Sequence, residues 1–205
     1  MEIAILNFCE NEWSIAEEDS PGANPMDIID NTNQIREAKA SHDKVIVIVH
    51  GGHEYYNQTI TRMQKQYRFY ADQGADIVVG HHTHCISGKR CIKECRFIIS
   101  LGNFLFSSRS TIEDCYNGLV LEIEIKDGNI CTHLYPVKQN KLSSQIFLSN
   151  GEEKDRTLER IHSFNTIIND EKKVFNEWNS YLNENSKNYL NYWSLLSYVN
   201  NQYIK

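Results

Sequence analysis

The sequence lacks any long run of apolar residues, and it lacks an excess of positive charge. No stretch of the 205 residues approaches the length needed to cross a bilayer, and no charged-then-apolar segment opens the chain as a secretory signal would. The formal net charge is -6, which argues against a nucleic-acid groove or a surface for anionic membranes. We therefore expect a soluble, cytoplasmic chain with no nucleic-acid partner, made of one domain or one domain plus an appendage.

The chain also lacks the signs of a disulfide framework, although it contains six cysteines. A chain of this length can bury a sizeable core and does not need covalent cross-links. Cys85, Cys91 and Cys95 follow a C-x5-C-x3-C spacing that does not match a usual zinc knuckle. We expect reduced thiols in or near the core rather than a zinc site.

What the sequence does contain is three short apolar runs that are typical of buried strands, at residues 45–49, 77–79 and 97–100. Each run stops at glycine and at polar or metal-binding side chains, in the segments 50–54, 80–84 and 101–104. In an open α/β sheet the loops at the carboxyl ends of the strands converge on one edge, where ligands bind. The pattern therefore predicts an active site at this edge.

The segments between these runs predict helices. Apolar residues recur at helical spacing over residues 26–40, after Pro25, and over 58–72, where Gly74 supplies a left-handed stop. Residues 2–8 read as a further buried strand. The alternation of strand and helix indicates a parallel or mixed sheet covered by helices.

The pattern changes from residue 118 onward. Residues 118–125 and 130–137 alternate apolar and polar residues around Asp127-Gly128, which is a strong hairpin signal. His133 falls in the middle of the second run, and we expect it to be structural or exposed rather than a ligand. Residues 151–205 contain no proline and predict two or three helices, including one over 189–203, that pack on the domain or on another chain.

Three histidines fall directly after predicted strands: His50, His82 and His84. His82 and His84 flank one residue on a tight turn, and Gly80 before them permits a sharp bend. Neutral imidazole is the commonest side-chain ligand of transition metals, so the three rings predict a metal site. The alternative is a polar cleft with structural histidines, because eight histidines in the chain make chance pairs unsurprising.

The three motifs at 45–54, 74–84 and 100–104 resemble the CapA family of capsule and poly-γ-glutamate synthesis, which is similar to the calcineurin-like metallophosphoesterases. The resemblance covers residues 1–140, the C-terminal portion of such a domain, and leaves 151–205 as a helical extension. It implies an α/β fold that forms part of a four-layer α-β-β-α sandwich. It also implies a role in the metabolism of a cell-surface polymer.

The resemblance implies roles for particular residues. His50, His82 and His84 match histidines that bind divalent metal ions of the Mn, Fe or Zn type, and His50, Glu54 and His84 are the expected catalytic residues. His81 stands where the family turn has glycine, so the choice between His81 and His82 as ligand stays open. Glu54 is expected to bind substrate or to orient a histidine, with a solvated loop carboxylate as the alternative. Asn103 could also reach a ligand.

One departure from the family pattern concerns the acidic residues that bridge two metal ions. The family supplies these residues from the first half of its domain, and none of them precedes Glu2 in this sequence. Two functions follow. The first is a metal-dependent hydrolase of the metallophosphoesterase type that acts on a phosphoester or a cell-surface polymer. The second is a truncated, non-catalytic half-domain, which needs a partner chain to complete the sheet and the incomplete metal site. The resemblance also implies that members of the family can be membrane-anchored.

Overall fold

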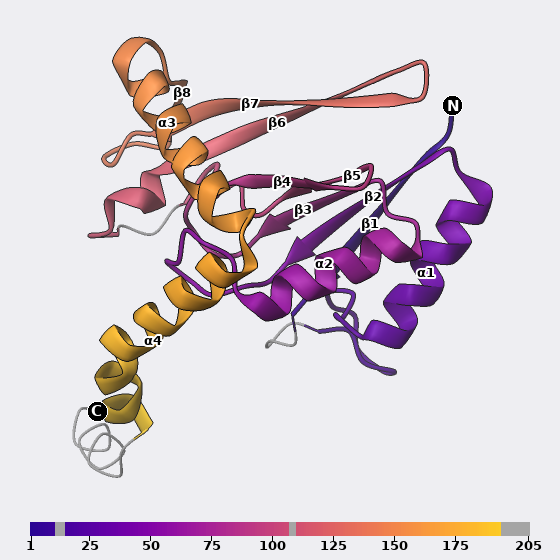
Figure 1. Cartoon of the computed structure of the whole chain (residues 1–205), viewed down its shortest axis with the longest axis horizontal. Coiled ribbons are helices and arrows are strands. Elements are labelled where there is room, and N and C mark those ends of the chain that lie inside the picture. The colour runs from indigo at the N-terminus through magenta and orange to yellow at the C-terminus, as the bar shows by residue number, and fades with distance from the viewer. Residues whose placement is uncertain (11–14, 107–109, 194–205) are drawn as a thin grey trace.

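The computed structural model describes residues 1–10, 15–106 and 110–193, with side chains up to residue 187, and contains two sheets (Figure 1). The larger sheet has the order β1-β2-β3-β5-β4. Strands β1, β2, β3 and β5 run parallel, and β4 pairs antiparallel with β5. The bounds of these strands are β1 Ile3–Cys9, β2 Lys44–His50, β3 Ile77–His81, β4 Lys89–Ile92 and β5 Cys95–Ile98.

Helices α1 (Ile28–Ser41) and α2 (Thr61–Gln73) cover one face of this sheet (Figure 1). The core between them includes Phe8, Val47 and Tyr70, each with no exposed surface, and the hydroxyl of Tyr70 donates a hydrogen bond to the buried Asn31 of α1 at 2.8 Å. Asp27, two residues after Pro25, caps α1 by accepting hydrogen bonds from the amides of residues 29 and 30, which fixes the helix start at Ile28. Gly74 ends α2 with a φ of 126°, as its position in the sequence predicts.

The other face of the larger sheet packs against a second, antiparallel sheet of order β6-β7-β8. Its strands are β6 Asn117–Lys126, β7 Asn129–Gln139 and β8 Ile146–Leu148, preceded by a short 3-10 helix, η1 Glu113–Tyr116. Asp127 and Gly128 form the predicted turn, both with positive φ, as a tight hairpin requires. Alternate residues such as Ile130 face the larger sheet, while His133 is exposed, as predicted.

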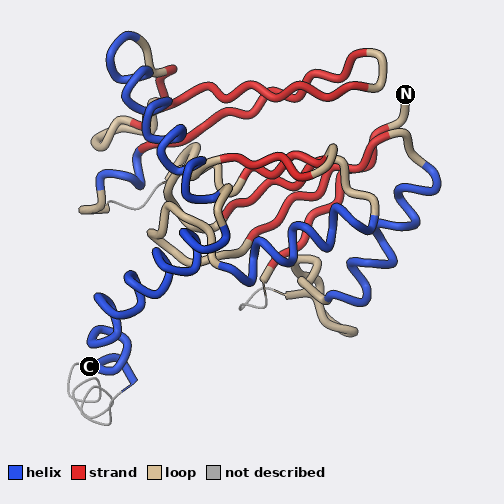
Figure 2. Tube along the Cα trace, viewed as in Figure 1, coloured by secondary structure: helices blue, strands red, loops and turns tan. Residues whose placement is uncertain are grey.

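Helices α3 (Gly151–Ile168) and α4 (Glu171–Trp193) follow the second sheet (Figure 2). Ile161 and Ile168 of α3 and Val174 of α4 are buried, so this helical extension packs on the domain itself. Phe164 of α3 packs against two buried clusters, the core under α1 and α2 and a smaller cluster that includes Ile86 and Leu119. The helix expected over 189–203 extends outside the described residues.

The α/β prediction is confirmed, and the described residues supply helix, sheet and sheet layers in the order expected for this sandwich. Two local predictions were wrong. Strand β5 covers 95–98 instead of the expected 97–100, because its start pairs with β4, which the sequence analysis missed. The second concerns Cys91, which was expected in or near the core but lies on β4 and is exposed. Cys131 is also exposed, whereas Cys85, Cys95 and Cys115 are buried. No cysteine of the described part is in a disulfide.

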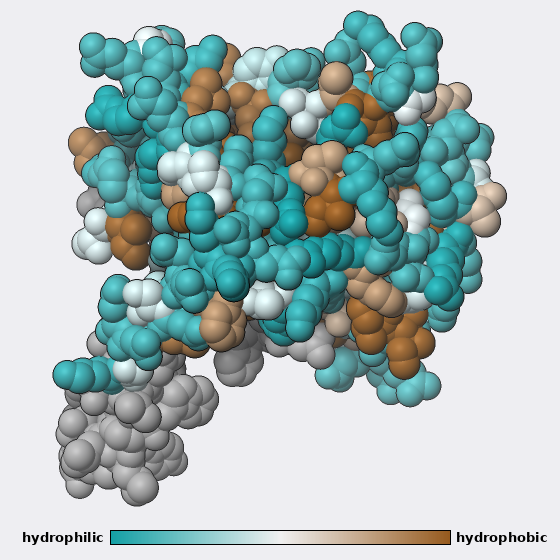
Figure 3. Space-filling view, in the orientation of Figure 1, coloured by the Kyte–Doolittle hydropathy of each residue, from teal (hydrophilic) through white to brown (hydrophobic). Residues whose placement is uncertain are grey.

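Among the described residues, none of the helices has the length and apolar character needed to span a bilayer. The face shown in Figure 3 is mostly hydrophilic, with small separate apolar patches. The division into domains 1–140 and 151–205 stays a prediction.

Candidate metal centre

The structure brings His50 and His82 into direct contact. His50 ends β2 and His81 ends β3, and the two residues are paired in the parallel register, so the loops that follow leave the sheet at the same edge. His82, the next residue, directs its Nδ1 to within 3.1 Å of the Nε2 of His50, and the two ring centroids are 4.8 Å apart. Burial and the neighbouring His50 lower the pKa of His81 below its ordinary value. Of the two open candidates, His82 is the one whose ring nitrogen faces His50.

The turn that carries the histidines has a strained backbone. His82 and His84 have φ angles of 92° and 57°, in the left-handed region that residues other than glycine rarely adopt. Gly80 has an ordinary φ, so the expected role as the bend is wrong. It is required for close packing instead, because a Cβ there would lie 2.0 Å from the carbonyl oxygen of Ile99. Thr83 supports the turn by donating a hydrogen bond to the hydroxyl of Ser100 at 2.8 Å.

His84 is oriented by Asn103. The Oδ1 of Asn103 lies 2.9 Å from the Nδ1 of His84, while the Nδ2 of Asn103 donates to the carbonyl oxygen of Cys115 at 3.0 Å. Since the amide oxygen can only accept, Nδ1 of His84 carries the proton, and the Nε2 of the neutral ring keeps its lone pair. Asn103 therefore sets the tautomer that metal binding through Nε2 requires.

Glu54 lies near the unprotonated side of His84. Its Oε1 is 3.9 Å from the Nε2 of His84, and its side chain is 48% exposed. The ring of Tyr55 stacks on His84 with centroids 5.8 Å apart, and Phe106 lies 4.9 Å away on the same measure. Glu54 thus faces both solvent and a candidate ligand, a position that suits contact with substrate.

Glu10 is a residue of this edge that the sequence analysis missed. It follows β1 directly, next to Cys9, which pairs with His50 at the end of β2, and this position after a strand was the available signal. Its Oε2 accepts a hydrogen bond from the amide of Gly52 at 2.7 Å, and its Oε1 pairs with Arg62. A Cβ on Gly51 would come within 2.9 Å of this carboxylate. Glu10 therefore anchors the loop that follows His50.

The residues fit a divalent cation in part. Two imidazole nitrogens bound to one ion at 2.0–2.1 Å lie roughly 3.0–3.4 Å apart, and the 3.1 Å between His50 and His82 meets this condition. The ring of His84 lies farther from this pair, with its centroid 6.1 Å from that of His82. Within the described segments, no three His, Cys, Asp or Glu side chains gather closely enough to form a complete ligand set. The arrangement is a two-histidine half-site with a third histidine beside it.

Comparison with known proteins places the same residues within one family. Residues 2–108 match the model of the family described as bacterial capsule synthesis protein PGA_cap. The chain is 37% identical over 106 residues to the PGA biosynthesis protein CapA of Bacillus subtilis (strain 168), and 34% identical over 110 residues to the capsule biosynthesis protein CapA of Bacillus anthracis. Each match covers 51% of this chain, and 28% and 27% of the two relatives, respectively.

Proposed function

The chain belongs to the bacterial capsule synthesis protein family, and from this premise we propose that it acts in capsule or poly-γ-glutamate synthesis as a metal-dependent hydrolase of the metallophosphoesterase type. The observation that carries the proposal is the contact of the ring nitrogens of His50 and His82 at the carboxyl edge of a parallel sheet. Such edges bind ligands in α/β folds. The names of the two relatives support the biosynthetic role.

In this proposal His50 and His82 hold the cation, and His84 lies close enough to contact the substrate or a further ligand. A divalent cation bound there would act as a Lewis acid toward a phosphoryl or carbonyl oxygen. Asn103 keeps the Nε2 of His84 free to accept a proton or to bind. The carboxylate of Glu54, 3.9 Å away, stabilises His84 when that ring is protonated.

The test combines metal binding with turnover. Titration of the purified chain with Mn²⁺, followed by calorimetry, is expected to show one bound ion in the wild type and loss of binding in His82→Ala. Hydrolysis of bis(p-nitrophenyl) phosphate with Mn²⁺ should disappear in the same variant. His133→Ala is the matched control, because His133 is exposed on β7, and it should behave as wild type. Absence of both binding and turnover with Mn²⁺, Fe²⁺ and Zn²⁺ would rule out the hydrolase.

A second candidate function, a non-catalytic half-domain that needs a partner chain, is favoured by the exposed apolar side of β1. Ile3 and Ile5 are 41% and 64% exposed on this edge strand. In the described part of the chain, the outer edge of β1 is paired only through the bridge of Cys9 to Pro25. Exposed edges of this kind pair with other polypeptides. We propose that a partner polypeptide pairs with this edge; Ile5→Lys should then abolish association without loss of the fold.

A further inference from the structure

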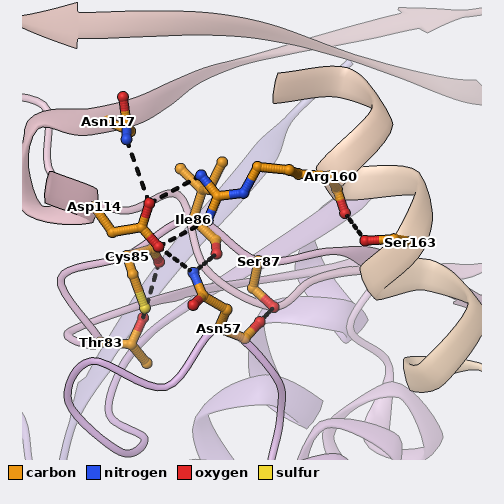
Figure 4. Close-up of polar contacts among 9 residues, drawn as sticks. All are labelled: Asn57, Thr83, Cys85, Ile86, Ser87, Asp114, Asn117, Arg160 and Ser163. Atoms are coloured by element: carbon orange, nitrogen blue, oxygen red, sulfur yellow. Dashed lines mark hydrogen bonds and ion pairs between the residues drawn. The ribbon is translucent and has the colours of Figure 1, made fainter. Parts of the chain in front are cut away.

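Helices α3 and α4 lie outside residues 2–108, which the family model matches. Helix α3 packs against Ile86, in the segment after His84, and contacts η1 through Arg160, while α4 contacts the loop after β2. Figure 4 shows the contact of α3, where the guanidinium of Arg160 points at the carboxylate of Asp114. Arg160 donates two hydrogen bonds, from Nη1 to Oδ1 at 2.9 Å and from Nη2 to Oδ2 at 2.8 Å. This bidentate geometry is the strongest form of the pair.

Asp114 is held from other sides as well. Asn57 donates to its Oδ2 at 3.0 Å, and Asn117 donates to its Oδ1 at 3.4 Å. Burial alone raises the pKa of Asp114, but the hydrogen bonds from Arg160 and Asn57 and the charge of Arg160 outweigh burial and lower it. The carboxylate is therefore ionised at neutral pH and fixed among its donors.

Through Asn57, this pair connects the two loops that carry the candidate ligands. The Nδ2 of Asn57 also donates to the carbonyl oxygen of Ile86 at 2.9 Å, and the hydroxyl of Ser87 donates to the carbonyl oxygen of Asn57. Asn57 lies three residues after Glu54, and Ile86 lies two residues after His84. One side chain thus ties the loop of His50 and Glu54 to the turn of His82 and His84.

Helix α4 makes a second contact with the first of these loops. The Nε2 of His53 lies 3.0 Å from the hydroxyl of Tyr181, and the ring of Trp178 lies 5.3 Å from that of His53 between centroids. Tyr56 packs on Tyr181 at 4.7 Å and on Trp178 at 5.3 Å. Aromatic pairs at these separations add stability beyond their buried area. The residues on both sides of Glu54 are therefore held by α4.

We propose that the helical extension is part of the candidate metal centre, with Arg160 as a positioning residue that acts through Asp114 and Asn57. The extension fixes the separation of the two loops, so that His82 meets His50 and Glu54 stays beside His84. The inference rests on the proposed function for its consequence in metal binding. The positioning of the loops itself can be tested without any metal.

The primary experiment is hydrogen–deuterium exchange on the full metal-free chain, comparing Arg160→Ala with wild type. We expect exchange of peptides covering 53–57 and 82–87 to become roughly tenfold faster, because two charge-assisted hydrogen bonds are lost. The control is Lys138→Ala. Lys138 lies on β7 and forms another ion pair with α3, to Glu153 at 2.5 Å, which this variant removes. It should leave these peptides unchanged. Equal protection of both loops in Arg160→Ala and wild type would overturn the inference.

Two further measurements separate positioning from simple loss of stability. Arg160→Lys keeps the charge but loses the bidentate geometry, so it should restore exchange in part; it also serves if Arg160→Ala does not fold. If the wild type binds Mn²⁺, Arg160→Ala should weaken its affinity for Mn²⁺ about tenfold. Lys138→Ala, compared under conditions where both variants have the same melting temperature, should bind Mn²⁺ as tightly as the wild type. Absence of Mn²⁺ binding in the wild type would count against the proposed hydrolase, while the exchange data would still decide the positioning role.

Discussion

Replacing Gly80 by alanine tests the close approach of β3 to the segment after β5. A Cβ at this position would lie 2.0 Å from the carbonyl oxygen of Ile99 and 2.5 Å from the hydroxyl of Tyr67, which is buried. Because real Cβ contacts under 3.0 Å are essentially unknown, the strands would have to separate by about 1 Å. Overpacking in a rigid interior costs about 1–3 kcal/mol, and a backbone clash belongs at the upper end.

A loss of about 3 kcal/mol corresponds to a melting temperature lower by about 6–12 °C for a chain of this size. Differential scanning calorimetry measures the shift. Gly128→Ala is the control, since a Cβ there would meet nothing within 4 Å. Only the φ of 77° disfavours alanine at this position, and it lowers the stability by about 1–2 kcal/mol. If Gly80→Ala melted as high as Gly128→Ala, the reasoning about the close approach would be refuted.

Three further predictions concern the core, a thiol and an ion pair. Phe8 has no exposed surface and packs on the aromatic core, so Phe8→Ala should lower the free energy of unfolding by about 3–5 kcal/mol in urea titrations; a loss under about 1 kcal/mol would contradict its burial. Iodoacetamide at pH 8 should modify exposed Cys91 in the native protein, and mass spectrometry should find Cys95 modified only after unfolding, because burial raises the pKa of Cys95 to about 12. The pKa of Asp114 is lowered in the fold, so the stability advantage of wild type over Asp114→Asn should be complete above about pH 4 and shrink as the pH falls further. A constant difference down to pH 3 would contradict that ion pair.

Much of the fold could be predicted because local patterns and packing agree. Residues 45–49 are all β-branched, and β2 is mostly buried because it lies between β1 and β3 with layers on both faces. Asp127-Gly128 fixes the turn of the hairpin by its own backbone preference. β4 was missed because its sequence, Lys-Arg-Cys-Ile, carries little apolar signal and becomes a strand only by pairing with β5.

The positions of the candidate ligands were predictable only where the order of the strands brings two residues to the same edge of the sheet. His50 and His82 lie together because parallel neighbours end at the same edge. The partner of His84 was not predictable, since Asn103 is 19 residues away and reaches it through the path of a loop. The pair of Arg160 and Asp114 spans 46 residues and two elements with no shared motif. Such contacts depend on tertiary packing, which sequence periodicity does not encode.

The positive φ angles of His82 and His84 have a consequence for the evolution of this turn. Each such angle costs a residue with a side chain of the order of 1–3 kcal/mol, whereas glycine adopts it freely. The backbone geometry alone therefore favours glycine at both positions, whereas the ring contacts of His82 with His50 and of His84 with Asn103 favour histidine. A variant that lost the function of these rings could therefore accept glycine at either position with little backbone cost, because the turn already has the φ angles that glycine adopts.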